Sequence, residues 1–305
     1  RADVNPFPHQ SIEDFYTAAS GKSRNIILPH HFGVTTRQPV VAGKFYPRRE
    51  QDLVEEIERC FRSPLGPGAV PKPAKGERRI CGAVAPHAGY EFSGHVAAHA
   101  YAAIARDGLP ETFVLIGPNH SGVGSAVAMS TEDFVTPLGT CRVDREIASR
   151  LERWIANDPY AHQYEHSIEV QLPFIQYLSK DVKFLPILMS LQDYETAREV
   201  GEQVRRSCSG KDVIILASTD FSHYVPEKKA RAEDLGVVEK IVSMSARGVY
   251  DTVVRRDVSM CGYGPVMAML EASQGRDAEL LRYGTSGDVY PMSEVVGYAA
   301  IVVRR

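Results

Sequence analysis

The sequence lacks any hydrophobic run long enough to cross a membrane, and it has no large excess of charge of either sign. Its longest apolar stretches, such as residues 213–217 and 298–303, have the length of strands, whereas a membrane helix needs about 20 residues. The formal net charge is −3, which gives no electrostatic reason to expect nucleic acid or an anionic membrane as a partner. We therefore expect a globular protein that binds neither.

Cysteine is sparse and is not arranged in pairs. The chain has 5 cysteines, an odd number without CxxC spacing, and no secretory signal peptide is visible. This pattern is typical of free thiols in a reducing compartment and not of a disulfide framework. We therefore expect a cytoplasmic protein.

Three common signals for nucleotide binding and hydrolysis are also absent: a Walker loop, GxGxxG after a strand, and GxSxG. What the chain does contain is a repeated order of strand, turn and helix. Strands are predicted over residues 80–85, 112–116, 127–130, 182–188, 212–217, 278–283 and 295–303. Near-continuous apolar strands alternating with helices predict an α/β fold, with a mixed, largely parallel central sheet and helices on both faces.

The first part of the chain differs from the rest. Residues 1–38 carry several prolines and show little periodicity, apart from a short helical stretch over residues 12–19. We interpret residues 1–38 as an N-terminal extension, partly irregular, and residues 39–305 as a single α/β domain. His30 and His31 in the extension fit a polar loop better than a metal site.

Three of the predicted strands are followed, a few residues past their last apolar position, by a histidine: His87, His120 and His223. In open α/β sheets, ligands bind outside the carboxyl ends of the strands, so these side chains are expected to converge on one edge. Neutral imidazole is the commonest protein ligand for zinc, iron and copper. A single histidine could serve only to cap a strand end, but for His87 and His120 together we favour a metal site.

Four residues near these strand ends allow more than one interpretation. Asp220 could accept a proton or orient an imidazole, or it could only stabilise a turn, and His223 could be a third ligand or a general acid/base. His166 lies at a predicted helix start and could face either the pocket or solvent. Cys261 lies among glycines at another predicted helix start, where a thiol's pKa falls, although most free cysteines are simply small buried residues.

Taken together, six segments resemble the Memo family, called AmmeMemoRadiSam system protein B in prokaryotes. They follow the family's order, and the resemblance covers roughly residues 40–305. The segments are AGKFYP at 42–47, APHAGY at 85–90, GPNH at 117–120, EHSIE at 165–169, STDFSH at 218–223 and MCG at 260–262. Each segment alone is weak, but six in one order are specific.

The resemblance implies a fold similar to that of the class III extradiol dioxygenases, which hold non-haem Fe(II) with two histidines and a glutamate. The Memo family looks like a variant in which a cysteine replaces that glutamate. By matching motif, the metal ligands would be His87, His120 and Cys261. His223 would stand at the acid/base position, with Asp220 as the second catalytic candidate.

The same resemblance places further residues around the pocket and narrows the choice of metal. The residues expected to line the pocket are His166, Tyr90 and Asn119. A thiolate is softer than a carboxylate and shifts preference toward Cu(I), while it still allows Fe(II) or zinc. The expected cofactor is therefore one transition metal ion, Fe(II) or Cu(I)/Cu(II), with zinc ranked lower.

Two functions remain in competition at the sequence level. One is a redox-active oxidoreductase related to the extradiol dioxygenases, and the other is a non-enzymatic peptide-binding or metal-handling module that uses the same pocket. A zinc-dependent hydrolase ranks third. A small-molecule or peptide ligand is the expected partner in either case, and the sequence leaves open both turnover and oligomeric state.

Overall fold

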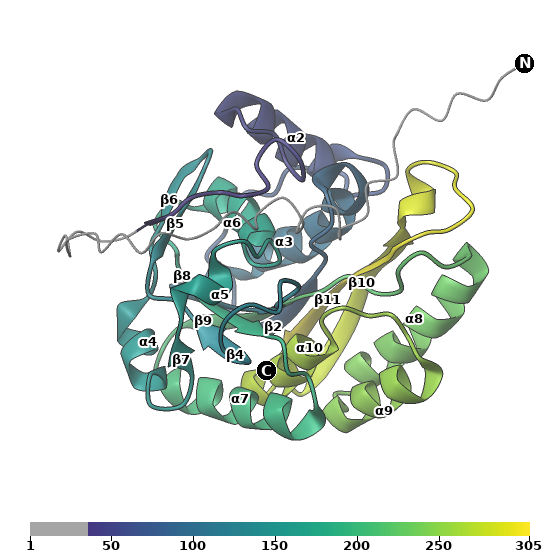
Figure 1. Cartoon of the computed structure of the whole chain (residues 1–305). Coiled ribbons are helices and arrows are strands. Elements are labelled where there is room, and N and C mark those ends of the chain that lie inside the picture. The colour runs from purple at the N-terminus through teal and green to yellow at the C-terminus, as the bar shows by residue number, and fades with distance from the viewer. Residues whose placement is uncertain (1–35) are drawn as a thin grey trace, which may run out of the picture. The chain divides into compact units, whose positions relative to one another are not determined.

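The computed structural model describes residues 36–305. Within this part of the chain the strands are β1 (Thr36–Arg37), β2 (Ile80–Ala85), β3 (Thr112–Pro118), β4 (Val127–Met129), β5 (Asp133–Thr136), β6 (Gly139–Cys141), β7 (Ala156–Asn157), β8 (Lys183–Met189), β9 (Val213–Ser218), β10 (Asp277–Thr285) and β11 (Gly297–Arg304). They form a large sheet in the order β10-β11-β2-β9-β3-β8-β4-β7 and a small sheet in the order β1-β5-β6 (Figure 1).

The centre of the large sheet is parallel. Strand β9 pairs in parallel with both β2 and β3, and β3 pairs in parallel with β8. The last two strands pair antiparallel with each other, and β11 is also antiparallel to β2. Because β2, β9 and β3 run side by side in one direction, the loops that follow them leave from the same edge of the sheet. Every residue of these three strands is buried, as their apolar runs predicted.

Helices cover both faces of the large sheet, which confirms the predicted mixed α/β class. They are α2 (Glu50–Arg62), α3 (His95–Asp107), α4 (Arg145–Leu151), α5 (Pro159–His162), α6 (Leu172–Leu178), α7 (Tyr194–Ser207), α8 (Glu227–Val242), α9 (Ala246–Arg256) and α10 (Tyr263–Ser273). Helix α3 packs on β2 and β11 with α2 and α6 behind it, whereas α10 packs on β9 with α7 and α9 behind it (Figure 1). None of the described helices is long and apolar enough to span a membrane.

One predicted helix differs in form from the expectation. The spacing predicted a single helix over residues 168–178, but the structure has a 3₁₀ turn over Glu169–Gln171 followed by α6. Pro173 lies in the first turn of α6 and has no N–H, so it cannot donate to the carbonyl four residues earlier. The α-helical ladder therefore begins only after the turn that carries Glu169 and Gln171.

The folded part of the chain includes residues that the sequence assigned to the N-terminal extension. Strand β1 pairs in parallel with β5 through Thr36 and Arg37. Arg37 is buried, and its Nη1 lies 2.5 Å from Oε2 of Glu169. Thr36 and Arg37 are therefore joined to the described domain. The short helix expected over residues 12–19, and the pair His30 and His31, lie outside the described residues.

His162, in α5, is buried without the partner that a charged imidazole needs. Its Nε2 lies 3.3 Å from the carbonyl oxygen of Ala128, and among the described residues its Nδ1 has no hydrogen-bond partner. Burial, aided by the positive charge of Arg37, lowers the pKa of His162 from 6.5 to about 3. The folded protein therefore binds this proton less readily than the unfolded chain does, so acid destabilises the fold.

We expect His162 to make stability fall as the pH drops below about 6.5. The loss is about 1.4 kcal/mol per pH unit once the pH is well below that value, and about 2 kcal/mol between pH 7 and pH 5. Urea unfolding of wild type and His162→Gln at both pH values measures it, and the variant should lose about 2 kcal/mol less than wild type. The free energy of unfolding of each protein at pH 5 is compared with its own value at pH 7. A loss of stability that is the same at both pH values therefore does not affect the result. Equal losses in the two proteins would contradict the prediction.

Candidate metal centre

Three side chains from distant parts of the chain meet at the carboxyl edge of the large sheet. His87 follows β2, His120 follows β3, and Cys261 lies two residues before α10. One ligand atom from each lies within 4.8 Å of the other two. The Sγ of Cys261 is 3.3 Å from Nε2 of His87, and the two imidazole centroids are 5.2 Å apart. Two strand-end histidines and one thiol therefore form a compact group of potential metal ligands.

The loop that carries Cys261 is fixed against the end of β9. The N–H of Gly262 donates to Oγ1 of Thr219 over 2.9 Å, and a Cβ at position 262 would lie 2.7 Å from the carbonyl oxygen of Ser218. Glycine is needed here because the two backbones approach so closely. The side chain of Gln192 holds the other side of the loop, where its Nε2 donates to the carbonyl oxygen of Cys261 over 2.9 Å.

Hydrogen bonds decide which nitrogen of His87 is available to a ligand. The hydroxyl of Ser218 donates to the carbonyl oxygen of Ser167 over 2.6 Å and accepts from Nε2 of Gln171 over 2.7 Å. Its hydrogen is thereby used, so toward Nδ1 of His87, 2.9 Å away, this oxygen can only accept. His87 is therefore protonated at Nδ1, and its Nε2 faces Cys261.

Glu165 plays the corresponding part for His120. Its Oε1 lies 3.0 Å from Nδ1 of His120, and its Oε2 accepts from the backbone N–H of the same residue over 2.5 Å. A carboxylate that accepts from one ring nitrogen fixes the tautomer and makes the other nitrogen a better metal ligand. Nε2 of His120 is the nitrogen left for the cluster.

The cluster also controls the charge of its thiol. Burial alone would raise the pKa of Cys261, but the imidazoles of His87, His120 and His223 hold it well below its usual value. A thiolate at Cys261 in turn raises the pKa of His120 to about 10, against the opposing effect of burial. The thiolate thus shares its surroundings with protonated imidazoles, and any metal ion bound there would have to displace those protons.

His120 also belongs to a second compact group, with Glu165 and His166. The oxygens of Glu165, however, already accept from the N–H groups of His166 and Ser167, each over 2.8 Å, besides those of His120. Burial lowers the pKa of His166 to about 3, so its ring is neutral and stacks on that of His120 with centroids 4.7 Å apart. The ring of His166 therefore lies against those of His87 and His120, and Glu165 positions the histidines beside it.

The two candidate proton-handling residues occupy different positions. Nδ1 of His223 donates to the carbonyl oxygen of Ser259 over 2.7 Å, which leaves Nε2 for the cluster. The Cys261 thiolate raises the pKa of His223 to about 9, although burial opposes it. Asp220 instead accepts from the backbone N–H of His87 over 2.8 Å, so it holds the loop after β2 and not an imidazole ring. Burial raises the pKa of Asp220.

Two residues expected to line the pocket are turned elsewhere. Tyr90 is buried, and its hydroxyl donates to the carbonyl oxygen of Val170 over 2.7 Å, because the π-helical turn at Tyr90–Gly94 directs the ring into the core. Asn119 shapes its own loop, since its Oδ1 accepts from Ser121 and its Nδ2 donates to the carbonyl oxygen of Val123 over 2.8 Å.

Sequence reasoning missed the residues that support the cluster. Ser218, Gln171 and Glu165 fix the imidazoles of His87 and His120. Ser218 and Glu165 belong to two of the six family-like segments, but the local pattern did not mark them as partners of these histidines, and Gln171 lies outside all six. Glu169 was equally overlooked. It is fully buried and accepts from the guanidinium of Arg37, from the hydroxyl of Tyr46 and from the backbone at residues 40 and 41. It ties the first described residues to the segment that carries Glu165.

The described chain is thus an α/β protein whose mixed sheet gathers two imidazoles and a thiol at its carboxyl edge. Residues 37–302 match the family model described as Memo-like protein, so the chain belongs to the Memo family. A MEMO1 family protein of Methanopyrus kandleri is 48% identical over 280 residues, which cover 88% of this chain and 99% of that protein. Another, from Methanosarcina acetivorans, is 50% identical over 277 residues, covering 88% and 98% of the two chains.

Among solved structures, the uncharacterized protein JW3007 from Escherichia coli K12 matches with a TM-score of 0.47 and 14% sequence identity. The match covers 63% of this chain and 86% of that one.

Proposed function

We propose that this Memo-family protein binds one iron or copper ion through Nε2 of His87, Nε2 of His120 and Sγ of Cys261, and that it acts as a redox-active oxidoreductase. The observation that carries the proposal is the pair of fixed tautomers. Ser218 and Glu165 each occupy Nδ1 of one histidine, so both imidazoles present Nε2 toward the thiol. Purely structural histidines have no need for this shared orientation.

The donor set favours a redox metal with a free coordination position. Three protein ligands leave room for a further ligand, as in catalytic and not in closed structural sites. A bound ion would supply one-electron chemistry or activation of a coordinated substrate. The residues of this chain would exclude bulk water and move protons. His223 is suited to the second task, because its Nδ1 is held by Ser259 and its Nε2 can give or take a proton.

Metal content tests the ligand assignment. We expect about one equivalent of iron or copper in protein purified without oxygen, and less than about a tenth in His87→Ala and Cys261→Ser. Matched controls are His99→Gln and Cys208→Ala, because Nε2 of His99 contacts the carbonyl oxygen of Leu65 and Cys208 is buried beyond α7. Elemental analysis measures the metal content of all five proteins. Equal metal content in wild type and the two site variants would contradict the assignment.

Turnover needs its own measurement, because a metal-handling or peptide-binding module could use the same ligands. We expect metal-loaded protein to consume oxygen with catechols or related aromatics, and His223→Gln to lose that activity while keeping its metal. Oxygen uptake that is absent in wild type, with the metal passed intact to a chelating peptide, would favour the metal-handling alternative. These two outcomes distinguish an enzyme from a protein that only binds and transfers the metal.

A further inference from the structure

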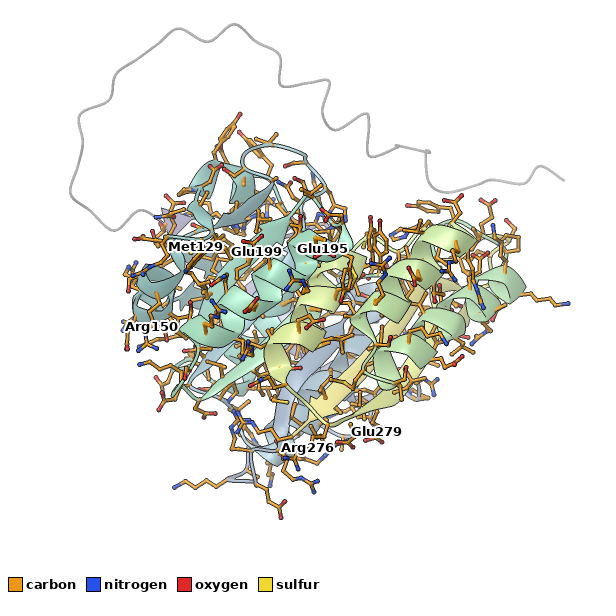
Figure 2. All side chains as sticks on the ribbon, turned by 90° about the horizontal axis from the view of Figure 1, so that it is seen from below. Met129, Arg150, Glu195, Glu199, Arg276 and Glu279 are labelled. Atoms are coloured by element: carbon orange, nitrogen blue, oxygen red, sulfur yellow. The ribbon has the colours of Figure 1, made fainter. Side chains whose placement is uncertain are left out.

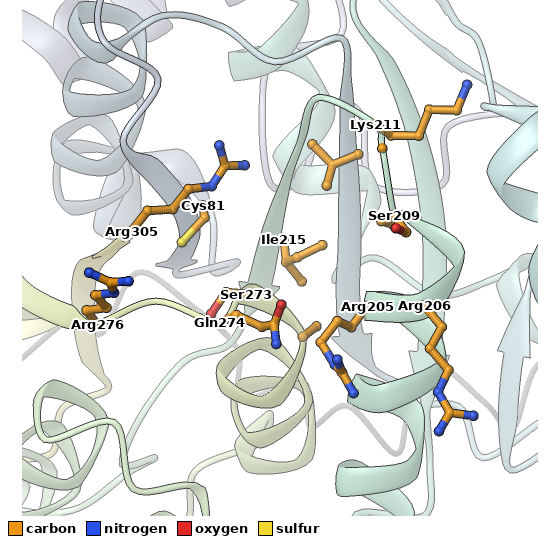
Figure 3. A pocket seen from close by; sticks show the side chains of 14 residues that line it. Cys81, Arg205, Arg206, Ser209, Lys211, Ile215, Ser273, Gln274, Arg276 and Arg305 are labelled. Carbon is orange, nitrogen blue, oxygen red and sulfur yellow. The ribbon is translucent and has the colours of Figure 1, made fainter.

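A cavity of about 880 Å³ lies at the amino edge of the large sheet, opposite the candidate metal centre (Figure 3). It is lined by the start of β2 and β9, the last turn of α7 and the end of α10. Strand β9 runs from Val213, which lines the cavity, to Ser218, which contacts His87. At about 3.3 Å per residue the two sites are roughly 17 Å apart. A small ligand in this cavity therefore cannot touch the candidate metal ligands.

The side chains that line the cavity are strongly biased toward positive charge. None of them is acidic, and the basic ones are Arg205, Arg206, Lys211, Arg276 and Arg305. Arg206 pairs with Glu202, and Lys211 pairs with Glu146. Within residues 36–305, the other three arginines form no ion pair, although the whole chain has a net charge of −3. Three arginines without an ion-pair partner among the described residues thus lie around one cavity.

The floor between these cations is uncharged and only partly apolar. Its apolar part consists of buried residues of the sheet and its flanking helices: Cys81, Cys208, Val213, Ile215 and Ala272. The polar side chains of Ser209, Ser273 and Gln274 lie beside them. Burial raises the pKa of Cys208 to about 12 and also raises that of Cys81, so both thiols are neutral. Figure 3 shows Arg276 and Arg305 on one side of the cavity, Arg205 and Arg206 on the other, and Ile215 between them. The cavity thus combines an uncharged floor with a cationic rim.

Helix electrostatics explain only part of this arrangement. Arg205 and Arg206 lie in the last turn of α7, where cations complement the negative end of the helix dipole. Arg276 follows the end of α10 at Ser273 by three residues and so also lies near the negative end of a helix, whereas Arg305 follows β11 and has no such role (Figure 2 places Arg276 where α10 gives way to β10). Helix and sheet therefore supply arginines independently to one space.

We propose that this cavity binds a small organic anion with at least two phosphate groups and a planar apolar portion, of the nucleoside diphosphate or triphosphate class. Its volume lies within the range of about 300–1,000 Å³ that is usual for ligand pockets. Guanidinium groups match phosphate oxygens in pairs, so arginines on opposite sides can clamp a polyphosphate. The apolar part of the floor suits the base. This site is independent of the function proposed above for the carboxyl edge.

Calorimetric titration with ATP in EDTA and low salt tests the proposal. We expect wild type to bind ATP, and the double variant Arg205→Gln/Arg276→Gln to bind it at least tenfold more weakly. The matched control is Arg255→Gln, because that side chain is 78% exposed on α9 and does not line the cavity. Both substituted arginines lack ion-pair partners within the described residues, so the double variant should unfold at the wild-type urea concentration.

Two further titrations complete the test. Cys261→Ser should bind ATP as wild type does, which separates this cavity from phosphate binding at the candidate metal centre. Tripolyphosphate should bind more weakly than ATP, because it cannot use the apolar floor. The proposal is overturned if wild type binds no ATP, if the double variant binds as tightly as wild type, if Cys261→Ser loses binding, or if tripolyphosphate binds as tightly as ATP.

Discussion

Replacing Arg37 by alanine is expected to lower the free energy of unfolding by about 3–5 kcal/mol, because it leaves the carboxylate of Glu169 buried without its counter-charge. The guanidinium also donates to the carbonyl oxygens of His162 and Glu165, over 2.8 and 2.5 Å, and lies 4.7 Å from the ring centroid of Phe134. One side chain thus supports β5, α5 and the turn before α6. Urea unfolding followed by circular dichroism measures the loss.

The matched control for this prediction is another arginine. Arg49→Ala removes a side chain that is 77% exposed and pairs with Asp52 at 3.5 Å, so its effect should stay within about 0.5 kcal/mol. Removing both buried charges, in Arg37→Met/Glu169→Leu, should cost less than Arg37→Ala alone, because no unpaired charge is left behind. Equal unfolding midpoints for Arg37→Ala and Arg49→Ala would contradict the assigned role of Arg37.

Glu165→Gln is expected to weaken metal binding by about 10–100-fold, the usual cost of losing a carboxylate that orients a ligand histidine. Glutamine keeps one oxygen but places an NH₂ group against N–H donors from His120, His166 and Ser167. Nδ1 of His120 then loses its acceptor or its fixed tautomer. Competition with a chelator of known affinity, using Co(II) as the probe metal, measures the change.

A spectroscopic readout separates positioning from general damage. Cys261 is unchanged in Glu165→Gln, so the thiolate-to-Co(II) charge-transfer band should persist at saturating metal. The matched control is Glu199→Gln, because Glu199 is exposed on α7 (Figure 2). Affinity that is the same in Glu165→Gln and Glu199→Gln would refute the role of Glu165. Loss of the charge-transfer band would instead indicate that the Cys261 loop had moved.

Local pattern was sufficient to predict most of the fold. β2 occupies the predicted residues 80–85, because a run of six apolar or small residues is too short for a typical buried helix and fits a strand that is covered on both faces. His87 and His120 could be linked in advance, because parallel strands carry the loops that follow them to one edge. The sequence alone did not single out Cys261 from Cys81, and it took the family resemblance to do so.

The remaining contacts of the site depend on which residues of distant strands lie opposite one another. The local sequence pattern does not specify that pairing. Ser218 can reach both His87 and Gln171 only because β9 lies beside β2 with Ala85 opposite Ser218. Arg37 finds Glu169 across 132 positions of sequence. The hydrogen bonds of Tyr90 and Asn119 were not predicted, for a related reason. Belonging to a motif does not fix which way a side chain points, and both are turned by hydrogen bonds within or behind their own loops.

The position of β9 between β2 and β3 has a consequence for biosynthesis. About 100 residues separate β3 from β9, and His120 precedes Cys261 by 141 positions (261 − 120). At about 5–20 residues per second, a ribosome needs roughly 7–28 s to add that segment. Throughout that interval the nascent chain offers two imidazoles without the thiolate, and Ser218, which orients His87, is added 98 positions after His120 and only 43 positions before Cys261. Any preference for a soft metal therefore belongs to the finished protein and cannot be exerted during translation.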